Sequence, residues 1–121
     1  MTPDEHFDRA VEPLLDDPRV SRARMFSAWG VKTGERFFGL LWRGRLVAKL
    51  PRGRVDALVA AGEGERFEPS PGRPMKEWVV IAPHAADGWA ALLGEARAFV
   101  AALPAERRRA RRPPAPRPRL R

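Results

Sequence analysis

Residues Arg24 to Leu50 read RMFSAWGVKTGERFFGLLWRGRLVAKL, and this stretch decides the fold. Short apolar runs separated by glycines are typical of strands joined by tight turns. We expect three strands here, at Arg22–Val31 with a bend near Ser27 and Gly30, at Arg36–Trp42, and at Arg45–Leu50. Their joins are too short for parallel crossovers, so the stretch predicts an antiparallel meander.

Alternation along each strand predicts which side chains share a face. In the second strand the two expected sets are Phe38, Leu40 and Trp42 against Phe37, Gly39 and Leu41. In the third strand a core face of Leu46, Ala48 and Leu50 alternates with a mixed face of Arg45, Val47 and Lys49.

Three helices are expected around this meander. Thr2 and Glu5 have the spacing of a capping box, and the amphipathic helix that follows meets Pro13, which predicts a kink or a loosened last turn. A short second helix opens after Pro51 and stops at Gly62. The last helix carries a wide apolar stripe from Trp89 to Leu103.

Two further strands are expected between the last two helices, at Arg66–Glu68 and Met75–Ala82. The sequence therefore predicts an α+β domain with an antiparallel five-stranded sheet packed by helices, in the order α-β-β-β-α-β-β-α. We expect a single domain over residues 1–104 and a disordered Arg/Pro-rich basic tail over residues 105–121, because the tail has too little apolar surface to offset the entropy of ordering.

The charge of the chain is unevenly placed. Its formal net charge is +8, and residues 107–121 hold eight arginines and no acid, which leaves 15 basic and 15 acidic residues in the rest. Within that neutral part, residues 19–54 sum to +9, whereas residues 1–18 and 55–106 sum to −5 and −4. The strand-rich centre is thus basic and its flanks are acidic.

Several classes of function are disfavoured by composition. The chain has no cysteine, so it offers no disulfide, thiolate metal site or cysteine nucleophile. His6 and His84 fit no metal spacing or nucleophile motif, and the glycines match no phosphate-binding fingerprint. We therefore expect no catalytic residue, no metal and no cofactor. The acidic N-terminus and the lack of long apolar runs predict a soluble, cytoplasmic protein with no membrane contact.

The central stretch resembles the N-terminal domain of the TfoX/Sxy family, whose members show an Arg-Met-Phe-Gly-Gly block, a hairpin glycine, a Phe-rich strand and a Leu-x-x-Lys strand. The matching positions are Arg24-Met25-Phe26, Gly30, Gly34, Phe37-Phe38 and Leu46–Lys49, and the likeness continues through Gly62, Phe67 and Trp78. It covers about residues 20–103.

This resemblance implies an α-β3-α-β2-α domain linked in some relatives to competence regulation. The sequence departs from the family in two places. Ser27 and Ala28 stand where the family has paired glycines, and the basic tail stands where larger members have a second, helical domain. The resemblance names no substrate.

Basic and aromatic residues of the predicted sheet form a candidate surface patch for an anion, with an aromatic ring for stacking. Its members are Arg24, Arg45, Lys49, Arg73, Lys76 and Trp78. Arg24 joins the patch only if the first and third strands are neighbours. The alternative is that Trp78 packs in the core and the cations keep a strand edge soluble.

The tail is a candidate for binding phosphate groups of a nucleic acid. Its candidate residues are Arg107, Arg108, Arg109, Arg111, Arg112, Arg117, Arg119 and Arg121. Arg outnumbers Lys 20 to 3 in the whole chain, so genome composition is an alternative explanation.

Three functions follow from these patterns. The first is a non-enzymatic regulatory or adaptor domain of TfoX N-terminal type that contacts a protein partner. The second is non-specific nucleic-acid binding through the tail. The third is a small-ligand binder or enzyme, which would need a deep pocket with convergent polar groups near Arg24, Lys49 or Trp78. Pairing of two copies of the chain stays open.

Overall fold

The structure, a computed structural model, describes residues 2–25, 27–69, 72 and 74–104. It contains three α-helices and a six-stranded sheet in which every pair of neighbours is antiparallel. The sheet order is β1-β2-β3-β4-β6-β5. The predicted α+β class and antiparallel sheet are confirmed, and the predicted count of five strands is wrong.

The error arises at the expected first strand, which is a hairpin of two strands. β1 (Val20–Met25) and β2 (Ala28–Thr33) are antiparallel, with Met25 opposite Ala28. The backbone φ of Ser27 is positive, in the left-handed region that non-glycine residues seldom occupy. The chain therefore reverses at Ser27, where the sequence indicated only a bend.

The next two strands meet at a second tight turn. β3 (Arg36–Trp42) and β4 (Arg45–Lys49) pair with Trp42 opposite Arg45. Arg43 and Gly44 between them both have positive φ, as a two-residue turn matched to strand twist requires.

β3 contains a bulge that changes the predicted faces. Val31 of β2 lies opposite Gly39, whereas Lys32 lies opposite Phe37, so Phe38 is the extra residue. An ideal Cβ on Gly39 would lie 2.5 Å from Leu93 Cδ2 of α3, so Gly39 faces the helices as Phe38 does. The prediction that Phe38 shares a face with Leu40 and Trp42 is therefore wrong, because Phe37 takes that place.

The helix α1 (Pro3–Val11) begins as its sequence predicts. The Thr2 hydroxyl accepts a hydrogen bond from the Glu5 backbone N–H, and the Glu5 carboxylate accepts one from the Thr2 backbone N–H at 2.8 Å. The α-helix ends at Val11, and the 3-10 helix η1 (Glu12–Asp16) follows, which confirms the loosened turn expected at Pro13.

The remaining elements complete the sheet and its cover. α2 (Arg52–Ala60) leads through Gly62, whose φ is also positive, to β5 (Glu65–Phe67), β6 (Met75–Ile81), the 3-10 helix η2 (Pro83–Gly88) and α3 (Trp89–Ala101). α3 buries its predicted stripe, whose members are Trp89, Leu92, Leu93, Ala96 and Val100. Phe99 is only partly buried.

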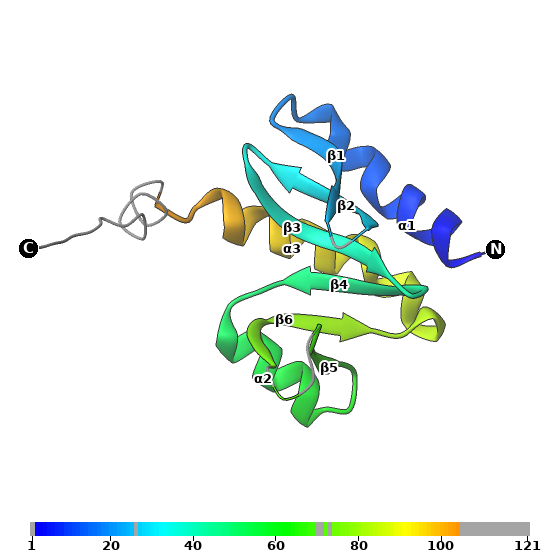
Figure 1. The fold of residues 1–121 in the computed structure, drawn as a ribbon, viewed down its shortest axis with the longest axis vertical. Coiled ribbons are helices and arrows are strands. Elements are labelled where there is room, and N and C mark those ends of the chain that lie inside the picture. Colours follow the sequence, from blue (N-terminus) through cyan, green and yellow to red (C-terminus); the bar gives the residue numbers. More distant parts are fainter. Residues whose placement is uncertain (1, 26, 70–71, 73, 105–121) are drawn as a thin grey trace, which may run out of the picture.

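The molecule has two layers. The buried side chains of all three α-helices belong to one core cluster, together with sheet residues such as Phe38, Leu46 and Val79. In Figure 1 the strands lie in front of α3, which crosses behind β3 and β4. The helices therefore cover one face of the sheet.

No helix among the described residues is long and apolar enough to cross a membrane. The predicted tail, residues 105–121, lies outside the described residues, as do Arg73 and all eight tail arginines of the candidate sites.

Candidate functional site

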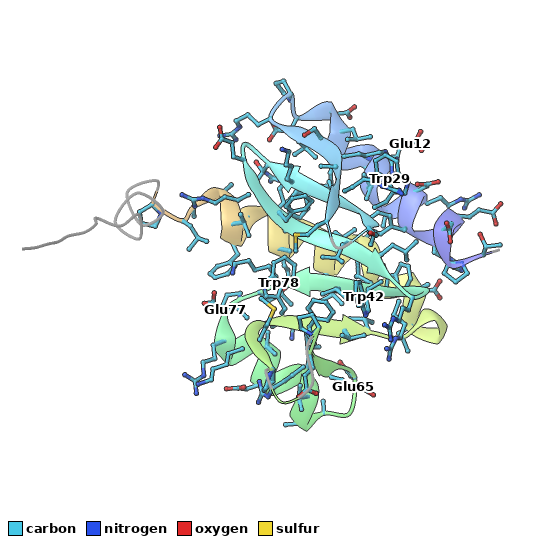
Figure 2. All side chains as sticks on the ribbon, viewed as in Figure 1. Glu12, Trp29, Trp42, Glu65, Glu77 and Trp78 are labelled. Atoms are coloured by element: carbon cyan, nitrogen blue, oxygen red, sulfur yellow. The ribbon has the colours of Figure 1, made fainter. Side chains whose placement is uncertain are left out.

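The sheet face opposite the helices carries a second apolar cluster made of strand residues. We call this surface the open face. Its buried members are Leu40, Val47, Phe67, Trp78 and Val80. Its partly buried members are Met25, Ala28, Phe37, Trp42 and Met75. Figure 2 shows Trp42 and Trp78 over the middle strands. Since each sheet residue faces one side or the other, these side chains do not share the core under the helices.

The local sequence explains how large rings reach this face. The bulge at Phe38 places Phe37 on the same face as Leu40 and Trp42, and Gly30 makes room for the ring of Phe37. A Cβ on Gly30 would lie 3.0 Å from Cε2 of Phe37 and 2.9 Å from the backbone oxygen of Gly39. The ring of Phe37 thus lies directly over the bare backbone of Gly30.

Three aromatic rings of the open face each have a cation above them. The side-chain nitrogen of Lys32 lies 6.0 Å from the ring centroid of Phe37, and that of Lys49 lies 5.4 Å from the centroid of Trp78. The guanidinium carbon of Arg43 lies 5.1 Å from the centroid of Trp42. The first two are pairs directly opposite on neighbouring strands. Each such contact contributes about 0.5–1 kcal/mol when exposed to water.

The rings differ in how far they are exposed. Phe67 and Trp78 are 2% and 6% exposed, and the rings of Phe67 and Trp42 meet edge to face at 5.4 Å. Phe37 and Trp42 are only partly buried. Phe67 and Trp78 are therefore buried within the surface, whereas Phe37 and Trp42 are partly accessible to solvent.

Two carboxylates reduce the positive charge of the face without cancelling it. Glu65 lies 3.9 Å from Arg45, and Glu77 lies 3.2 Å from Lys49. Both pairs are partly exposed, and pairs of this kind stabilise a protein by about 0–1 kcal/mol. Within the part of the chain that the structure describes, Lys32 and Arg43 make no ion pair. The face is therefore cationic around its partly exposed rings, Phe37 and Trp42.

Part of the patch predicted from the sequence is brought together here. Lys49 lies directly opposite Trp78, and Arg45 lies on the same strand as Lys49. Lys76 is an exposed residue of β6 in an irregular part of the strand, where Arg66 lies opposite Val79 and Phe67 lies opposite Met75. These four residues of the predicted patch belong to the neighbouring strands β4 and β6.

Arg24 lies elsewhere. β1 is separated from β4 by two strands, and the Arg24 guanidinium lies 4.8 Å from the ring centroid of Trp29. Trp29 is 51% exposed and lines a shallow cavity with Phe7 of α1, on the helix side of the sheet. Arg24 and Trp29 thus form a cation and aromatic pair on the face opposite Lys49 and Trp78.

Sequence reasoning missed Lys32, Phe37, Trp42 and Arg43. Trp42 was expected to share a face with Phe38, and the bulge made that expectation wrong for Phe38. A usable signal was the turn at Gly44, since a two-residue turn places Trp42 opposite Arg45 and so on the predicted mixed face.

Other arginines of the basic segment hold the fold together. Arg22 pairs with Asp8 of α1 at 3.0 Å, and Arg54 donates to both carboxylate oxygens of Glu95 in α3. The hydrogen bond to the Glu95 carboxylate raises the pKa of Arg54 above its ordinary value. The high positive charge of residues 19–54 is therefore divided between structural ion pairs and the open face.

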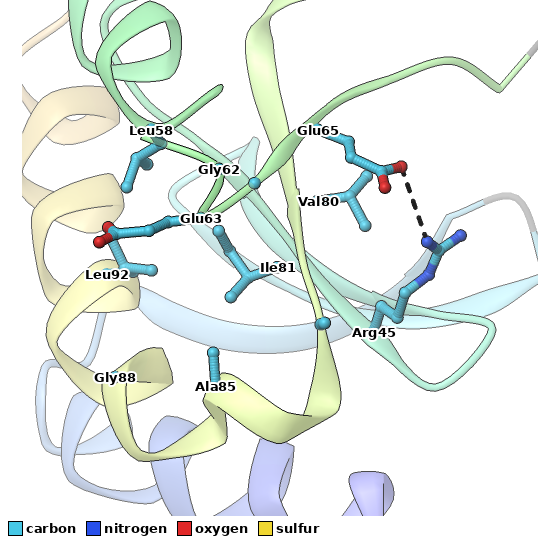
Figure 3. A pocket seen from close by; sticks show the side chains of 12 residues that line it. Arg45, Leu58, Gly62, Glu63, Glu65, Val80, Ile81, Ala85, Gly88 and Leu92 are labelled. Carbon is cyan, nitrogen blue, oxygen red and sulfur yellow. Dashed lines mark ion pairs between the residues drawn. The ribbon is translucent and has the colours of Figure 1, made fainter. Parts of the chain in front are cut away.

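The chain also has a cavity of about 420 Å³ beside the open face (Figure 3). Leu58, Ile81 and Leu92 line its apolar wall, while Glu65 and Arg45 lie at its polar end. It includes none of Arg24, Lys49 and Trp78. Among the described residues, no three His, Cys, Asp or Glu side chains gather in a way that could hold a metal ion.

The sequence matches none of the models of known protein families, and it matches none of the curated proteins with which it was compared.

Proposed function

We propose that this protein is a non-enzymatic regulatory or adaptor domain of the TfoX N-terminal type, which binds a partner through the open face. The observation that carries the proposal is a helix-free sheet face with two partly exposed rings, Phe37 and Trp42, each beside a cation without an ion pair among the described residues. When one face of an antiparallel sheet is only a solvated surface, the strand residues on that face are normally polar. Leu40 and Val47 of this cluster are fully buried, and its partly buried rings form the apolar surface that a partner can contact.

Two features support the family type. The elements follow the order that the family implies, apart from the extra strand formed at Ser27. Ser27 stands where the family has the first of its paired glycines, and its positive φ is a conformation that glycine adopts readily. The backbone thus keeps the shape for which a glycine is the usual choice.

The charge of the open face favours an anionic partner, either a protein or a nucleic acid. The cytoplasm remains the expected location, and the tail arginines remain a second candidate for nucleic-acid contacts. The tail and the open face make separable predictions, because substitutions in one leave the other intact.

A pull-down from the native host tests the proposal. The full chain with Lys32→Glu and Arg43→Glu should lose the partner that the wild-type chain retains, since both cations flank the exposed rings. A chain with Arg9→Glu and Arg52→Glu is the matched control, because it makes the same change of charge at exposed positions of α1 and α2. Retention of the same partner by both variants would contradict the proposal.

A further inference from the structure

We infer that the partner of the open face is single-stranded nucleic acid, bound by stacking of unpaired bases on Phe37 and Trp42 and by contacts of its phosphates with the adjacent cations. This inference rests on the proposed function, because it names the partner of the same surface. It depends on the charge of the face, on its partly exposed rings and on its width.

The positive charge of the open face favours a polyanion over a second copy of this chain as the partner. Lys32, Arg43, Arg45 and Lys49 surround the apolar cluster, and only Arg45 and Lys49 have carboxylate partners among the described residues. A second copy of this chain would place a cationic face against another, which is unfavourable. A polyanion is attracted to the same surface and releases its counterions on binding.

The rings of Phe37 and Trp42 favour a single-stranded nucleic acid over a duplex or an acidic peptide. A planar base can stack on a partly exposed aromatic ring, and such stacking tolerates every base because each has a π-face. In a duplex the bases are already stacked on one another, so they cannot reach the rings of Phe37 and Trp42. An acidic peptide matches the positive charge, but its carboxylate side chains do not stack on the aromatic rings. Each of these partly exposed rings has a cation over its face, so a base that stacks there displaces the side chain of Lys32 or Arg43. The displaced cation then contacts the adjacent phosphate, which fits a chain that alternates bases and phosphates.

The dimensions of the face set the length of the bound strand. The rings and cations extend from β2 across β3 and β4 to β6, which are consecutive in the sheet. Strands lie about 4.8 Å apart, so the face is about 15 Å wide. A surface of this size accommodates on the order of four nucleotides, at the lower end of known single-strand sites.

The test measures fluorescence anisotropy of a labelled oligothymidylate of about 12 nucleotides, long enough to cover the face. The protein is the full chain with its eight tail arginines replaced by serine, so that binding reports on the open face alone. We expect binding whose log affinity falls with log salt at a slope of roughly −3, because each of four phosphate contacts on a single strand contributes about −0.7.

Substitutions of single rings then test whether the oligonucleotide binds at the open face. Phe37→Leu and Trp42→Leu keep an apolar side chain and should each weaken binding by about 5- to 150-fold, the effect of losing one stacked base. Trp29→Leu is the matched control, since it removes an exposed ring with its own cation from the opposite side of the sheet and should leave affinity unchanged. The double variant Lys32→Gln, Arg43→Gln keeps both rings but removes two cations. The slope of log affinity against log salt should therefore become less steep.

Three results would overturn the inference. They are the absence of binding when the tail arginines are replaced, equal affinity for a duplex of the same length, and unchanged affinity in both open-face ring variants. If the pull-down partner still depends on Lys32 and Arg43 but resists nuclease treatment, the open face binds a protein. In that case the proposed function stands and the inference of a nucleic-acid partner is wrong.

Discussion

Gly30 shows how a single residue shapes the open face. Its missing side chain lets the ring of Phe37 lie over β2, and a Cβ would press on that ring and on the backbone oxygen of Gly39. Because a neighbouring strand cannot move without breaking its ladder, Gly30→Ala should lower the free energy of unfolding by about 1–3 kcal/mol. Urea denaturation measures this change.

Gly94 provides the control for that experiment. It lies in the middle of α3, and a Cβ there would meet nothing within 4 Å. Gly94→Ala should stabilise the protein by about 0.5–1 kcal/mol, because alanine loses less conformational entropy than glycine in a helix. Equal destabilisation by both substitutions would contradict the packing described for Gly30.

Glu5 predicts a pH dependence of stability. The Thr2 backbone N–H donates to its carboxylate, which holds the pKa of Glu5 below its ordinary value of 4.5. A lowered pKa in the folded state means that this stabilisation is present above the ordinary value and is lost as the pH falls through the lower, folded-state pKa. Glu5→Gln should therefore be less stable than the wild type at neutral pH, with a difference that shrinks in acid.

Urea unfolding of both chains at a series of pH values measures that difference. A gap between Glu5→Gln and the wild type that stayed constant into the acid range would rule out this role of the carboxylate. Arg9 also lowers the pKa of Glu5, as a smaller effect, so Arg9→Gln should reduce the pH dependence only slightly.

Backbone conformation is the residue-scale feature that the sequence predicted least well. The capping box of Thr2 and the left-handed Gly62 follow from residue type, and both were predictable. Ser27 and Arg43 also have positive φ, and neither residue type demands it. The turn at Arg43 and Gly44 was still expected from its glycine, whereas the reversal at Ser27 was not, so one predicted strand proved to be two.

Arg36 joins two elements that are distant in the sequence. Its side chain leaves β3 and donates to the backbone oxygens of Leu103, at 2.9 Å, and Pro104, at 2.7 Å, just beyond α3. A cation at this end also complements the helix dipole. Arg36→Ala should lower stability by about 1–2 kcal/mol in urea denaturation, whereas Arg52→Ala, at an exposed position of α2, should change it by less than about 0.5 kcal/mol.

Hydrogen exchange adds a local measurement for Arg36. Amides of the last turn of α3 should lose protection in Arg36→Ala, while those near Trp89 keep theirs. Uniform loss along the helix would indicate that Arg36 acts on global stability and does not anchor this end.

Trp89 anchors the other end of α3. Its side chain is fully buried, its ring meets His6 of α1 edge to face at 6.1 Å, and its indole nitrogen has no hydrogen-bond partner among the described residues. Trp89→Ala should lower the free energy of unfolding by about 3–5 kcal/mol. Phe99→Ala should have a smaller effect, because Phe99 is only partly buried. A larger loss at Phe99, measured by urea denaturation, would contradict this order.

At the scale of elements, the periodicity of apolar residues predicted the buried side of an element only where the element is regular. The stripe of α3 and the alternation in β4 and in residues 78–81 of β6 are regular, so their buried residues were predictable. β3 has apolar residues on both sides, and nothing in its sequence distinguishes a bulge at Phe38 from regular alternation. That bulge decides that Phe37 joins the open face.

At the scale of the molecule, the sequence predicted a basic centre but not its division between two surfaces. Arg24 has Trp29 as its partner on the helix side, whereas Lys49 has Trp78 on the open face. The sign of a segment is visible in its composition. The face on which each cation lies depends on strand order and register, which only the folded sheet defines.

The four tryptophans offer the most direct test of the open face as a binding surface. Trp42 and Trp78 belong to it, Trp29 lies on the other side of the sheet, and Trp89 is in the core. NMR spectra of the full chain, recorded as single-stranded oligothymidylate is added, follow the indole N–H signal of each. We predict that the signals of Trp42 and Trp78 shift while those of Trp29 and Trp89 stay in place. A shift confined to Trp29, or no indole shift when the oligonucleotide binds, would contradict binding at the open face.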